Sequence, residues 1–433
     1  MRPAPLLLWL LALWALLGLL ASFALVPPPA WALAGALLAL LAGIDALRLR
    51  RQRLPSVRRD LPEALAVGVE RPVELVLEAG AQRQRVDVFD LHPVGWEAEG
   101  LPRRLDLVPG SDSRFAYRLR PVERGHAEFA GVHLRLHAPW RLWRRRATVM
   151  PEQKVRVFPN FAPLARLALL GAEQASRAMG AHVRRRRGEG TDYHQMRDYR
   201  VGDSLRRIDW KATARMRRLI SREYQDERNQ QLVLLVDTGQ RMLARDGLLS
   251  HFDQTLDAAL VVSWLALRQG DAVGLLASGG ARRWVPPQRG AGAIDVLLRA
   301  TFDLQPRPVA TDYLAAATEL TLRQRRRSLV MLMTNLRDED SEDLLAAVGL
   351  LRQRHHVVVA SLREAALDAA LDEDVRDLRG ALRATSAARY LQHRAVAHDA
   401  LRAHRVAVLD VTCAELPGAL VEHYLMVKRE GLL

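Results

Sequence analysis

Carboxylates and guanidinium groups alternate in one dense run near the middle of the chain, where Asp203 and Asp209 lie among Arg206, Arg207 and Arg215. Carboxylates and arginine forks form bidentate pairs, which fix the orientation of two segments or two proteins. Carboxylates also serve as general acids and bases. The run therefore suggests a structural joint or an interaction surface, with acid–base hydrolysis as the alternative.

Asp237 is a second candidate, because it closes a continuous apolar run at residues 231–236. Asn335 and Asp410 close two similar runs later in the chain. Ligands of open α/β sheets bind at the carboxyl ends of the strands, so all three side chains are expected there. The residues after Asp237 lack the glycines and lysine of a phosphate-binding loop.

Signatures of known enzyme classes do not emerge from the sequence. It has no Ser-His-Asp order, zinc-ligand spacing or paired-carboxylate motif on a defined scaffold. The single cysteine, Cys413, excludes an intramolecular disulfide and lies in an apolar stretch where packing is expected. We predict a protein that is not an enzyme and has no cofactor and no small-molecule substrate. The alternative is a membrane-associated hydrolase that uses carboxylates of the charged run or of the strand ends.

Residues 231–433 are predicted to form a doubly wound α/β domain. Strands buried on both faces and separated by helices are typical of a parallel sheet covered on two sides. The Gly279-Gly280 and Pro286-Pro287 pairs are interpreted as turns and loops. The apolar runs that predict strands lie at residues 231–236, 272–277, 328–334, 356–361 and 406–410, and helical spacing appears near residues 252–267, 311–323, 342–352, 386–403 and 415–428.

Residues 60–160 differ in pattern, with short runs that alternate apolar and polar residues between Gly and Pro. Period-two alternation with frequent turns predicts an antiparallel β-sandwich. Residues 161–230 are interpreted as a polar, arginine-rich connector with helical stretches, and this connector contains the charged run.

The N-terminal segment, residues 1–50, is predicted to be a two-span transmembrane hairpin. Residues 3–44 carry no charge and are interrupted by Pro27-Pro28-Pro29, which favours spans near residues 6–26 and 31–47. A secretory signal peptide would have a shorter apolar region and no second run. Asp45 is expected close enough to the interface to be solvated. The arginines that follow favour a cytoplasmic location for both ends, and they are Arg48, Arg50, Arg51, Arg53, Arg58 and Arg59.

The net charge of +15 does not indicate nucleic-acid binding. Only three of the 64 basic residues are lysines, and the arginine runs are scattered instead of being interleaved with aromatic residues on one surface. We therefore predict no nucleic-acid partner and expect anionic lipid headgroups beside the hairpin to be the nearer partner for this charge.

The charged run closely resembles the signature of the bacterial domain of unknown function 58 family. That signature has the form R-x-Y-x-x-G-D-x-x-R-x-I-D-W, then A-R, then R-E, then a strand that ends L-x-D. Asp198 and Arg207 lie within the same segment and are also candidates for a partner-binding or structural role. The matching residues are Arg197, Tyr199, Gly202, Asp203, Arg206, Ile208, Asp209, Trp210, Ala214, Arg215, Arg222, Glu223 and Asp237.

The resemblance implies a membrane-anchored partner of MoxR-type AAA+ ATPases that acts in assembly or maturation of protein complexes. It also implies a von Willebrand factor type A-like α/β domain, and a location at the bacterial inner membrane with the soluble domains in the cytoplasm. Two roles for the signature stay open: a network that joins the connector to the α/β domain, or a surface that binds the partner. In either case Trp210 is expected to anchor the segment by burial.

Type A domains often hold Mg²⁺ with the motif D-x-S-x-S, a distant Thr and a further Asp. The resemblance therefore allows a prediction of whether this chain keeps the metal ligands. Gly239 and Arg241 stand at the two serine positions, Thr311 is the candidate threonine, and Asn335 replaces the second aspartate. Mg²⁺ requires oxygen ligands in near-octahedral geometry. We therefore predict a degenerate site that binds no metal, in which Arg241 pairs with Asp237.

Overall fold

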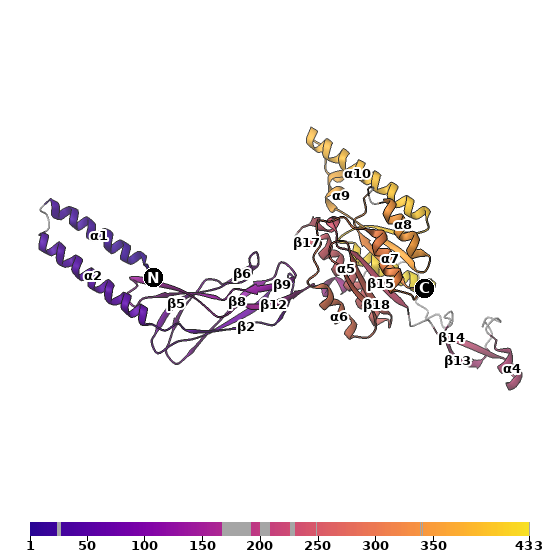
Figure 1. The fold of residues 1–433 in the computed structure, drawn as a ribbon, viewed down its shortest axis with the longest axis horizontal. Helices are drawn as coiled ribbons and strands as arrows, with labels where there is room; N and C mark the ends of the chain where they lie inside the picture. The colour runs from indigo at the N-terminus through magenta and orange to yellow at the C-terminus, as the bar shows by residue number, and fades with distance from the viewer. Residues whose placement is uncertain are drawn as a thin grey trace. The chain divides into compact units, whose positions relative to one another are not determined.

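A computed structural model describes residues 1–23, 27–166, 192–199, 208–225, 230–247, 249–337, 339 and 341–432. Its contacts divide the chain into two compact units, Met1–Phe158 and Pro159–Leu433. Each unit is described by itself below (Figure 1).

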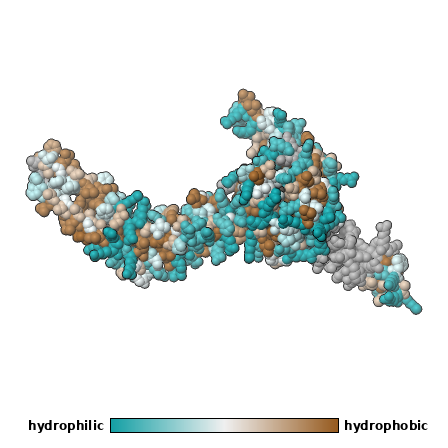
Figure 2. Space-filling model, viewed as in Figure 1, coloured by the Kyte–Doolittle hydropathy of each residue, from teal (hydrophilic) through white to brown (hydrophobic). Residues whose placement is uncertain are grey.

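Two apolar helices begin the first unit. α1 (Pro5–Ser22) and α2 (Pro28–Arg51) are long and apolar enough to cross a membrane, with mean hydropathy values of 2.2 and 1.9. The space-filling view shows apolar surface gathered over this helical pair (Figure 2). The prediction of two N-terminal apolar helices, interrupted at the prolines, is confirmed.

The two helices meet through a symmetric pair of tryptophans. The Trp14 and Trp31 rings stack with centroids 4.9 Å apart, and each indole N–H donates to the other residue's backbone carbonyl at 3.2 Å. Gly18 lies beneath Trp31 and Gly35 beneath Trp14, where a Cβ would come within 2.8 and 2.7 Å of the indole nitrogens. The two glycines therefore permit the close approach of the rings.

Both ends of the hairpin attach to one sheet of the sandwich. The short β1 (Arg2–Pro3) pairs with β11 (Trp143–Val149), and Ala4 N–H donates to Leu142 O at 2.8 Å. At the other end, Trp143 Nε1–H donates to Ala42 O in α2 at 2.9 Å. The N-terminus and the end of α2 are thus held on the same side of the apolar pair.

Asp45 completes this attachment, and it is not solvated as the sequence suggested. Its side chain is fully buried, and its two oxygens accept hydrogen bonds from the backbone N–H groups of Trp140 and Leu142, each at 3.0 Å. The turn between β10 (Val132–His137) and β11 therefore replaces the water that the interface was expected to supply. The Arg48 guanidinium lies 4.8 Å from the centre of the adjacent Trp140 ring.

The remainder of the first unit is a sandwich built mainly from antiparallel sheets, as predicted. Alternation decides which side chains face the core: Val73 and Leu75 in β4, and Leu134 and Leu136 in β10, are fully buried. The sheets have the orders β1-β11-β10-β5-β7, β2-β4-β8-β6 and β3-β12-β9. Their remaining strands are β2 (Ser56–Asp60), β3 (Ala64–Ala66), β4 (Arg71–Glu78), β5 (Gln84–Asp90), β6 (Glu97–Glu99), β7 (Arg103–Leu107), β8 (Asp112–Arg120), β9 (Gly125–Phe129), β10 (Val132–His137) and β12 (Gln153–Phe158).

Arg59 belongs to this core and is not a flanking charge of the hairpin. It forms a fully buried ion pair with Asp90, which also accepts a hydrogen bond from Tyr117 Oη at 2.6 Å. Arg59 also donates to Gln153 Oε1 at 2.9 Å. The sequence-based interpretation failed here because a run of arginines does not reveal which of its members points inward.

The second unit contains a six-stranded sheet with the order β19-β18-β15-β20-β21-β22. Five strands are parallel, and β19 pairs antiparallel with β18 at one edge. The bounds are β15 (Gln231–Asp237), β18 (Ala272–Ser278), β19 (Arg283–Gln288), β20 (Leu329–Thr334), β21 (His356–Arg363) and β22 (Ala407–Thr412).

Helices cover both faces of this sheet, which confirms the predicted α/β architecture. α5 (His251–Arg268), α6 (Gly292–Thr301) and α11 (Leu416–Glu430) pack on one face. α7 (Tyr313–Arg323), α8 (Ser341–Arg352) and α10 (Leu378–Ala403) pack on the other. The shorter elements are η2 (Gln240–Leu243), β16 (Arg245–Asp246), β17 (Leu249–Ser250) and α9 (Ala365–Asp372).

The edge strand β19 was interpreted as a loop because of Pro286 and Pro287. Proline cannot donate a ladder hydrogen bond, so it is tolerated in a strand mainly at a sheet edge. β19 has β18 as its only sheet neighbour in the described chain, and its register shifts between Val273 and Leu275 of that strand. The pairing with β18 therefore makes this segment a strand, although its two prolines favour a loop.

We expect Asp45→Ala to lower the free energy of unfolding of the sandwich by about 1–3 kcal/mol, because two buried N–H groups lose their acceptor. Asp45→Asn should also destabilise the sandwich, because its amide NH2 would face one of the two backbone N–H groups as a second donor. Thermal or denaturant unfolding of the full chain in detergent measures this effect. Asp60→Ala, at an exposed site, is the matched control and should stay within about 0.5 kcal/mol of the parent. Equal effects of Asp45→Ala and Asp60→Ala would contradict the role given to Asp45.

Candidate functional site

The order of the sheet places a topological switch point between β15 and β20. From β15 the chain winds first to β18 and β19, then returns to β20 on the opposite side and continues to β22. Crevices that bind ligands in open α/β sheets form at such a point, at the carboxyl ends of the strands. Asp237 ends β15 and Thr334 ends β20, so both stand at this position.

Four donors surround the buried carboxylate of Asp237. Oδ1 accepts hydrogen bonds from the Gly239 backbone N–H at 2.7 Å and from Thr311 Oγ1 at 2.5 Å. Oδ2 accepts from Thr334 Oγ1 at 2.7 Å and from Tyr313 Oη at 3.2 Å. Two carboxylate oxygens offer about four lone-pair sites, so the protein itself fills the coordination capacity of Asp237.

Two glycines permit this close packing. A Cβ on Gly239 would overlap Thr311 Oγ1 and lie 2.8 Å from Val309 O. A Cβ on Gly279, whose φ is +115°, would lie 2.6 Å from Thr311 Oγ1 and 3.2 Å from Asp237 Oδ1. The cavity beside Asp237 has a volume of only about 10 Å³, which is close to the least that one water requires. Any side chain at position 239 would therefore displace Thr311 from Asp237. Gly239 also lacks the hydroxyl oxygen that a serine would offer to a metal.

The other two residues of the predicted degenerate site lie elsewhere, which corrects the expected pairing of Arg241 with Asp237. Arg241 Nη2 forms an ion pair with Glu339 Oε2 at 2.7 Å. Asn335 is fully buried and donates from Nδ2 to Glu364 Oε1 at 2.8 Å. Of the five residues predicted for this site, the structure therefore joins Asp237, Gly239 and Thr311.

A buried arginine, Arg394 of α10, gathers the polar side chains at the ends of β20, β21 and β22. It donates to Asn335 Oδ1 at 3.1 Å, to Leu336 O at 2.9 Å and to Ser361 Oγ at 2.7 Å. Its Nε and Nη2 also approach Asp410 Oδ1 at 3.2 and 3.1 Å. Asn335 and Asp410 thus help to position a helix against the sheet.

His398 lies one turn further along α10 and joins the same network. Its Nε2 lies 3.0 Å from Ser361 Oγ. Burial lowers the pKa of His398 to about 4, and the neighbouring Arg394 charge acts in the same direction. The imidazole is therefore neutral at physiological pH and serves as a hydrogen-bonding group.

The described part of the signature forms a small module of two strands and one helix. β13 (Asp192–Asp198) pairs antiparallel with β14 (Ile220–Gln225). α4 (Trp210–Met216) connects to β14 through Thr213, whose Oγ1 accepts from Ile220 N–H at 3.0 Å. This module contains the signature residues that the structure describes, apart from Asp237, which ends β15.

Asp209 acts within this module as a helix cap. It is 5% exposed, and its Oδ1 accepts the Ala212 backbone N–H at 3.0 Å. Such N-caps are worth roughly 0.5–2 kcal/mol. Asp198 pairs at 3.1 Å with Arg218, and both side chains are about 60% exposed. Arg215 lies in the last turn of α4 and is exposed, while Tyr199 is half-buried. These contacts favour a structural role for Asp209 in particular.

Trp210 differs from its predicted role as a buried anchor, because its side chain is 67% exposed. The cap at Asp209 places Trp210 at the first position of α4, and α4 buries none of its residues. Three further apolar side chains of the module, Met196, Met216 and Leu219, are 44–58% exposed. An apolar surface on a polar module therefore replaces the expected anchor.

For the remaining signature residues, the structure describes either the backbone alone or nothing. Gly202, Asp203, Arg206 and Arg207 lie outside the described residues. Arg197 lies in β13 and Arg222 with Glu223 in β14, and only their backbone is described. Their predicted roles stay predictions.

Comparison with known proteins identifies the family. Residues 195–406 match the family described as "Protein of unknown function DUF58". The chain belongs to the DUF58 family. The matched range begins in β13 of the signature module and extends almost to β22 of the sheet.

Relatives of this DUF58 chain include proteins named as uncharacterized in Mycobacterium bovis and in two strains of Mycobacterium tuberculosis. Each is 28% identical over 159 residues, which is 36% of this chain and 50% of the relative. The chain therefore spans about half the length of the curated relatives it matches.

Similarity to solved structures is low. An aerotolerance-related membrane protein from Bacteroides fragilis covers 46% of this chain and 99% of its own, with 14% identity and a TM-score of 0.29. The C-terminal part of α-2-macroglobulin from Escherichia coli covers 25% of this chain and 17% of its own, with 17% identity and a TM-score of 0.21.

Several residues of this DUF58 chain's site were missed by sequence analysis. Tyr313 and Thr334 hold Asp237, and Arg394 holds Asn335 and Asp410. Thr334 did carry a signal, since it ends a predicted strand. Tyr313 and Arg394 carried none, because a helical residue reveals its tertiary partner only after the helix is placed.

We expect the α/β domain to bind no divalent cation at Asp237, because its oxygens already accept four hydrogen bonds and a cation would have to displace them. Calorimetric titration of the full chain with Mg²⁺ and Mn²⁺ should show no site near Asp237, and neither ion should raise the melting temperature. A micromolar site that Asp237→Ala abolishes, but Asp60→Ala leaves intact, would contradict this prediction.

Proposed function

We propose that this chain is a membrane-anchored interaction protein that works with a MoxR-type AAA+ ATPase in assembly or maturation of protein complexes. The observation that carries the proposal is the exposure of Trp210, a residue of the family signature. A tryptophan that stays two-thirds exposed leaves a large apolar side chain available, and tryptophan is enriched among the residues that dominate binding energy at interfaces.

The surroundings of Trp210 support a docking surface. Met196, Met216 and Leu219 are exposed on the same module, and the exposed Arg215 adds positive charge to it. Interfaces commonly combine an apolar centre with a charged rim and are enriched in Trp, Met and Arg. A partner with an apolar patch bordered by carboxylates would match this composition.

The state of the strand-end carboxylates argues against the hydrolase alternative. A general base must reach the proton that it abstracts. The Asp237 oxygens are occupied by four donors, and Asp410 is held by Arg394 and Arg363. Among the described strand ends, these two carboxylates are therefore engaged in holding the fold together.

The α/β domain is proposed to be of the von Willebrand factor A type. An antiparallel edge strand beside an otherwise parallel sheet, an aspartate at the end of β15 and a threonine hydroxyl against it all fit that assignment. In such a domain the occupied Asp237 would make partner binding independent of metal.

The hairpin is proposed to anchor the protein in the bacterial inner membrane, with the folded units in the cytoplasm. Exposed Arg48, Arg50 and Arg51 end α2, and positive flanks favour the cytoplasmic side. The attachment of β1 and Asp45 to one sheet supports a common side for both ends.

We expect reporter fusions at Met1 and after Arg59 to be active only as cytoplasmic reporters. A fusion inserted at Pro27 should be active only as a periplasmic reporter, because α1 and α2 each cross the bilayer once. Periplasmic activity of the fusion after Arg59 would overturn the proposed orientation.

We expect Trp210→Ala to weaken binding of the full chain to the ATPase at least tenfold, since an exposed apolar anchor would be lost at the interface. Binding is measured by pull-down and titration with the ATPase trapped in its ATP state. The matched control is Leu322→Ala, an α7 side chain that is 73% exposed, and it should bind like the parent.

Both variants should keep the parent's melting temperature, because they remove exposed side chains. Charge reversal at Arg206 and Arg207 should also weaken the complex without unfolding the protein. Loss of folding in that charge variant would support the purely structural role of the signature. Hydrolytic activity that Asp237→Asn abolishes would instead favour the hydrolase.

A further inference from the structure

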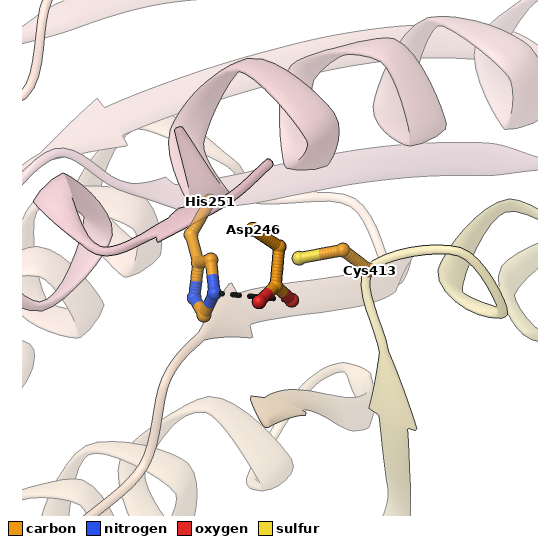
Figure 3. A group of neighbouring side chains, drawn as sticks. All are labelled: Asp246, His251 and Cys413. Carbon is orange, nitrogen blue, oxygen red and sulfur yellow. Dashed lines mark ion pairs between the residues drawn. The ribbon is translucent and has the colours of Figure 1, made fainter. Parts of the chain in front are cut away.

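Three residues distant in sequence converge beside the carboxyl ends of the strands. Asp246 ends β16, His251 begins α5, and Cys413 follows β22 (Figure 3). One ligand atom from each residue lies within 4.8 Å of the other two. Carboxylate oxygen, imidazole nitrogen and thiolate sulfur are the three ligand types that protein zinc sites use.

The imidazole of His251 has an unusual environment. The side chain is fully buried, and neither Nδ1 nor Nε2 has a hydrogen-bond partner. Buried polar groups are normally hydrogen-bonded, because leaving one unpaired costs about 1–3 kcal/mol. Figure 3 shows the ring facing the Asp246 carboxylate. The ring nitrogen Nε2 thus faces the Asp246 carboxylate at ion-pair distance, without a hydrogen bond to it.

The distance between His251 and Asp246 fits a shared tetrahedral ion. Nε2 lies 3.6 Å from Asp246 Oδ2, which is longer than a hydrogen bond. Zinc bonds of about 2.0–2.2 Å to nitrogen and oxygen place two tetrahedral ligand atoms roughly 3.3–3.6 Å apart. The pair is therefore spaced as two ligands would be.

The thiol of Cys413 is protonated in the absence of a metal. Burial raises its pKa to about 12, and the adjacent Asp246 carboxylate contributes in the same direction. The thiol is therefore neither a nucleophile nor a redox-reactive thiolate at neutral pH. A bound cation would reverse this situation, because a coordinating thiol is deprotonated outright.

Neighbouring charges suit a cation. Glu364 acts electrostatically on both His251 and Cys413, and its Oε2 is buried without a hydrogen-bond partner. Arg394 also acts on His251, but its guanidinium is paired with Asp410. Glu364 therefore adds negative charge beside the three ligands, partly balanced by Arg337, whose Nη2 lies 3.9 Å from Glu364 Oε1.

We propose that Asp246, His251 and Cys413 form a Zn²⁺ site in the α/β domain, separate from Asp237. Zn²⁺ would bind the Cys413 sulfur, one Asp246 oxygen and one His251 ring nitrogen, and the thiol proton would pass to solvent. The thiolate and the carboxylate together balance the charge of the ion. Three protein ligands leave a fourth position for water or Glu364.

A soft thiolate ligand and an imidazole select zinc over magnesium or calcium, which prefer oxygen. The bound ion would join the β16–β17 hairpin and the start of α5 to the segment that follows β22. This site is independent of the partner proposed above.

The test uses the full chain in detergent, stripped with a chelator and then titrated with Zn²⁺ or Co²⁺. We expect one ion per chain, and a thiolate-to-cobalt absorption band in the Co²⁺ form. Cys413→Ala should abolish this band, and Asp246→Asn and His251→Gln should each lower the affinity for Zn²⁺ at least tenfold. The matched control is His355→Gln, because His355 is also buried with both ring nitrogens unpartnered. This control should bind Zn²⁺ like the parent.

A second measurement needs no variant. Cys413 is the sole cysteine, so the rate of thiol alkylation in the parent chain reports on this site alone. Zn²⁺ should slow alkylation at least tenfold, and excess chelator should restore the rate. Absence of protection, or Zn²⁺ binding that Cys413→Ala leaves unchanged, would overturn the proposal.

Discussion

Burying a carboxylate is costly unless hydrogen-bond donors replace the lost water, and this constraint organises both units of the chain. Asp45 receives two N–H groups of a turn, Asp90 receives Arg59 and Tyr117, and Asp237 receives four donors. Asp271 in turn receives Tyr424 and Lys428. Apart from the Gly239 N–H beside Asp237, these donors come from residues far away in sequence, so each buried aspartate fixes the position of one segment against another.

Most of the fold could be predicted from the sequence because apolar periodicity reports burial directly, although the β13–β14 pair of the connector was not predicted. The continuous apolar runs at β15, β18, β20 and β21 alternate with helical segments, which predicted strands covered on both faces. The alternating runs at β4 and β10 predicted a sandwich. Exceptions occurred where a local signal competed with tertiary pairing. β19 forms a strand despite its two prolines, since an edge position needs fewer donors.

The site could be predicted only in part, because a motif identifies residues and not their partners. Asp237 and Thr311 were expected together, and they touch. Arg241 instead forms an ion pair with Glu339, and Asn335 forms hydrogen bonds with Arg394 and Glu364. These partners come close to Arg241 and Asn335 only in the folded domain, so the motif alone could not identify them. Trp210 stayed exposed because the cap at Asp209 begins a short helix that buries none of its residues. The cluster of Asp246, His251 and Cys413 could not be predicted for the same reason, since its last two members lie 162 positions apart in the sequence.

The pairing of β1 with β11 has a consequence for biosynthesis. Residues 2–3 are made before both apolar helices, yet their strand partners are residues 143–144, which are made after these helices and most of the sandwich. The edge of β11 can be closed only if residues 2–3 lie where the sandwich folds. A chain inserted the wrong way round would leave that edge unpaired, and unpaired edges promote aggregation. With the proposed membrane anchor, this short strand would link correct insertion to completion of the sandwich.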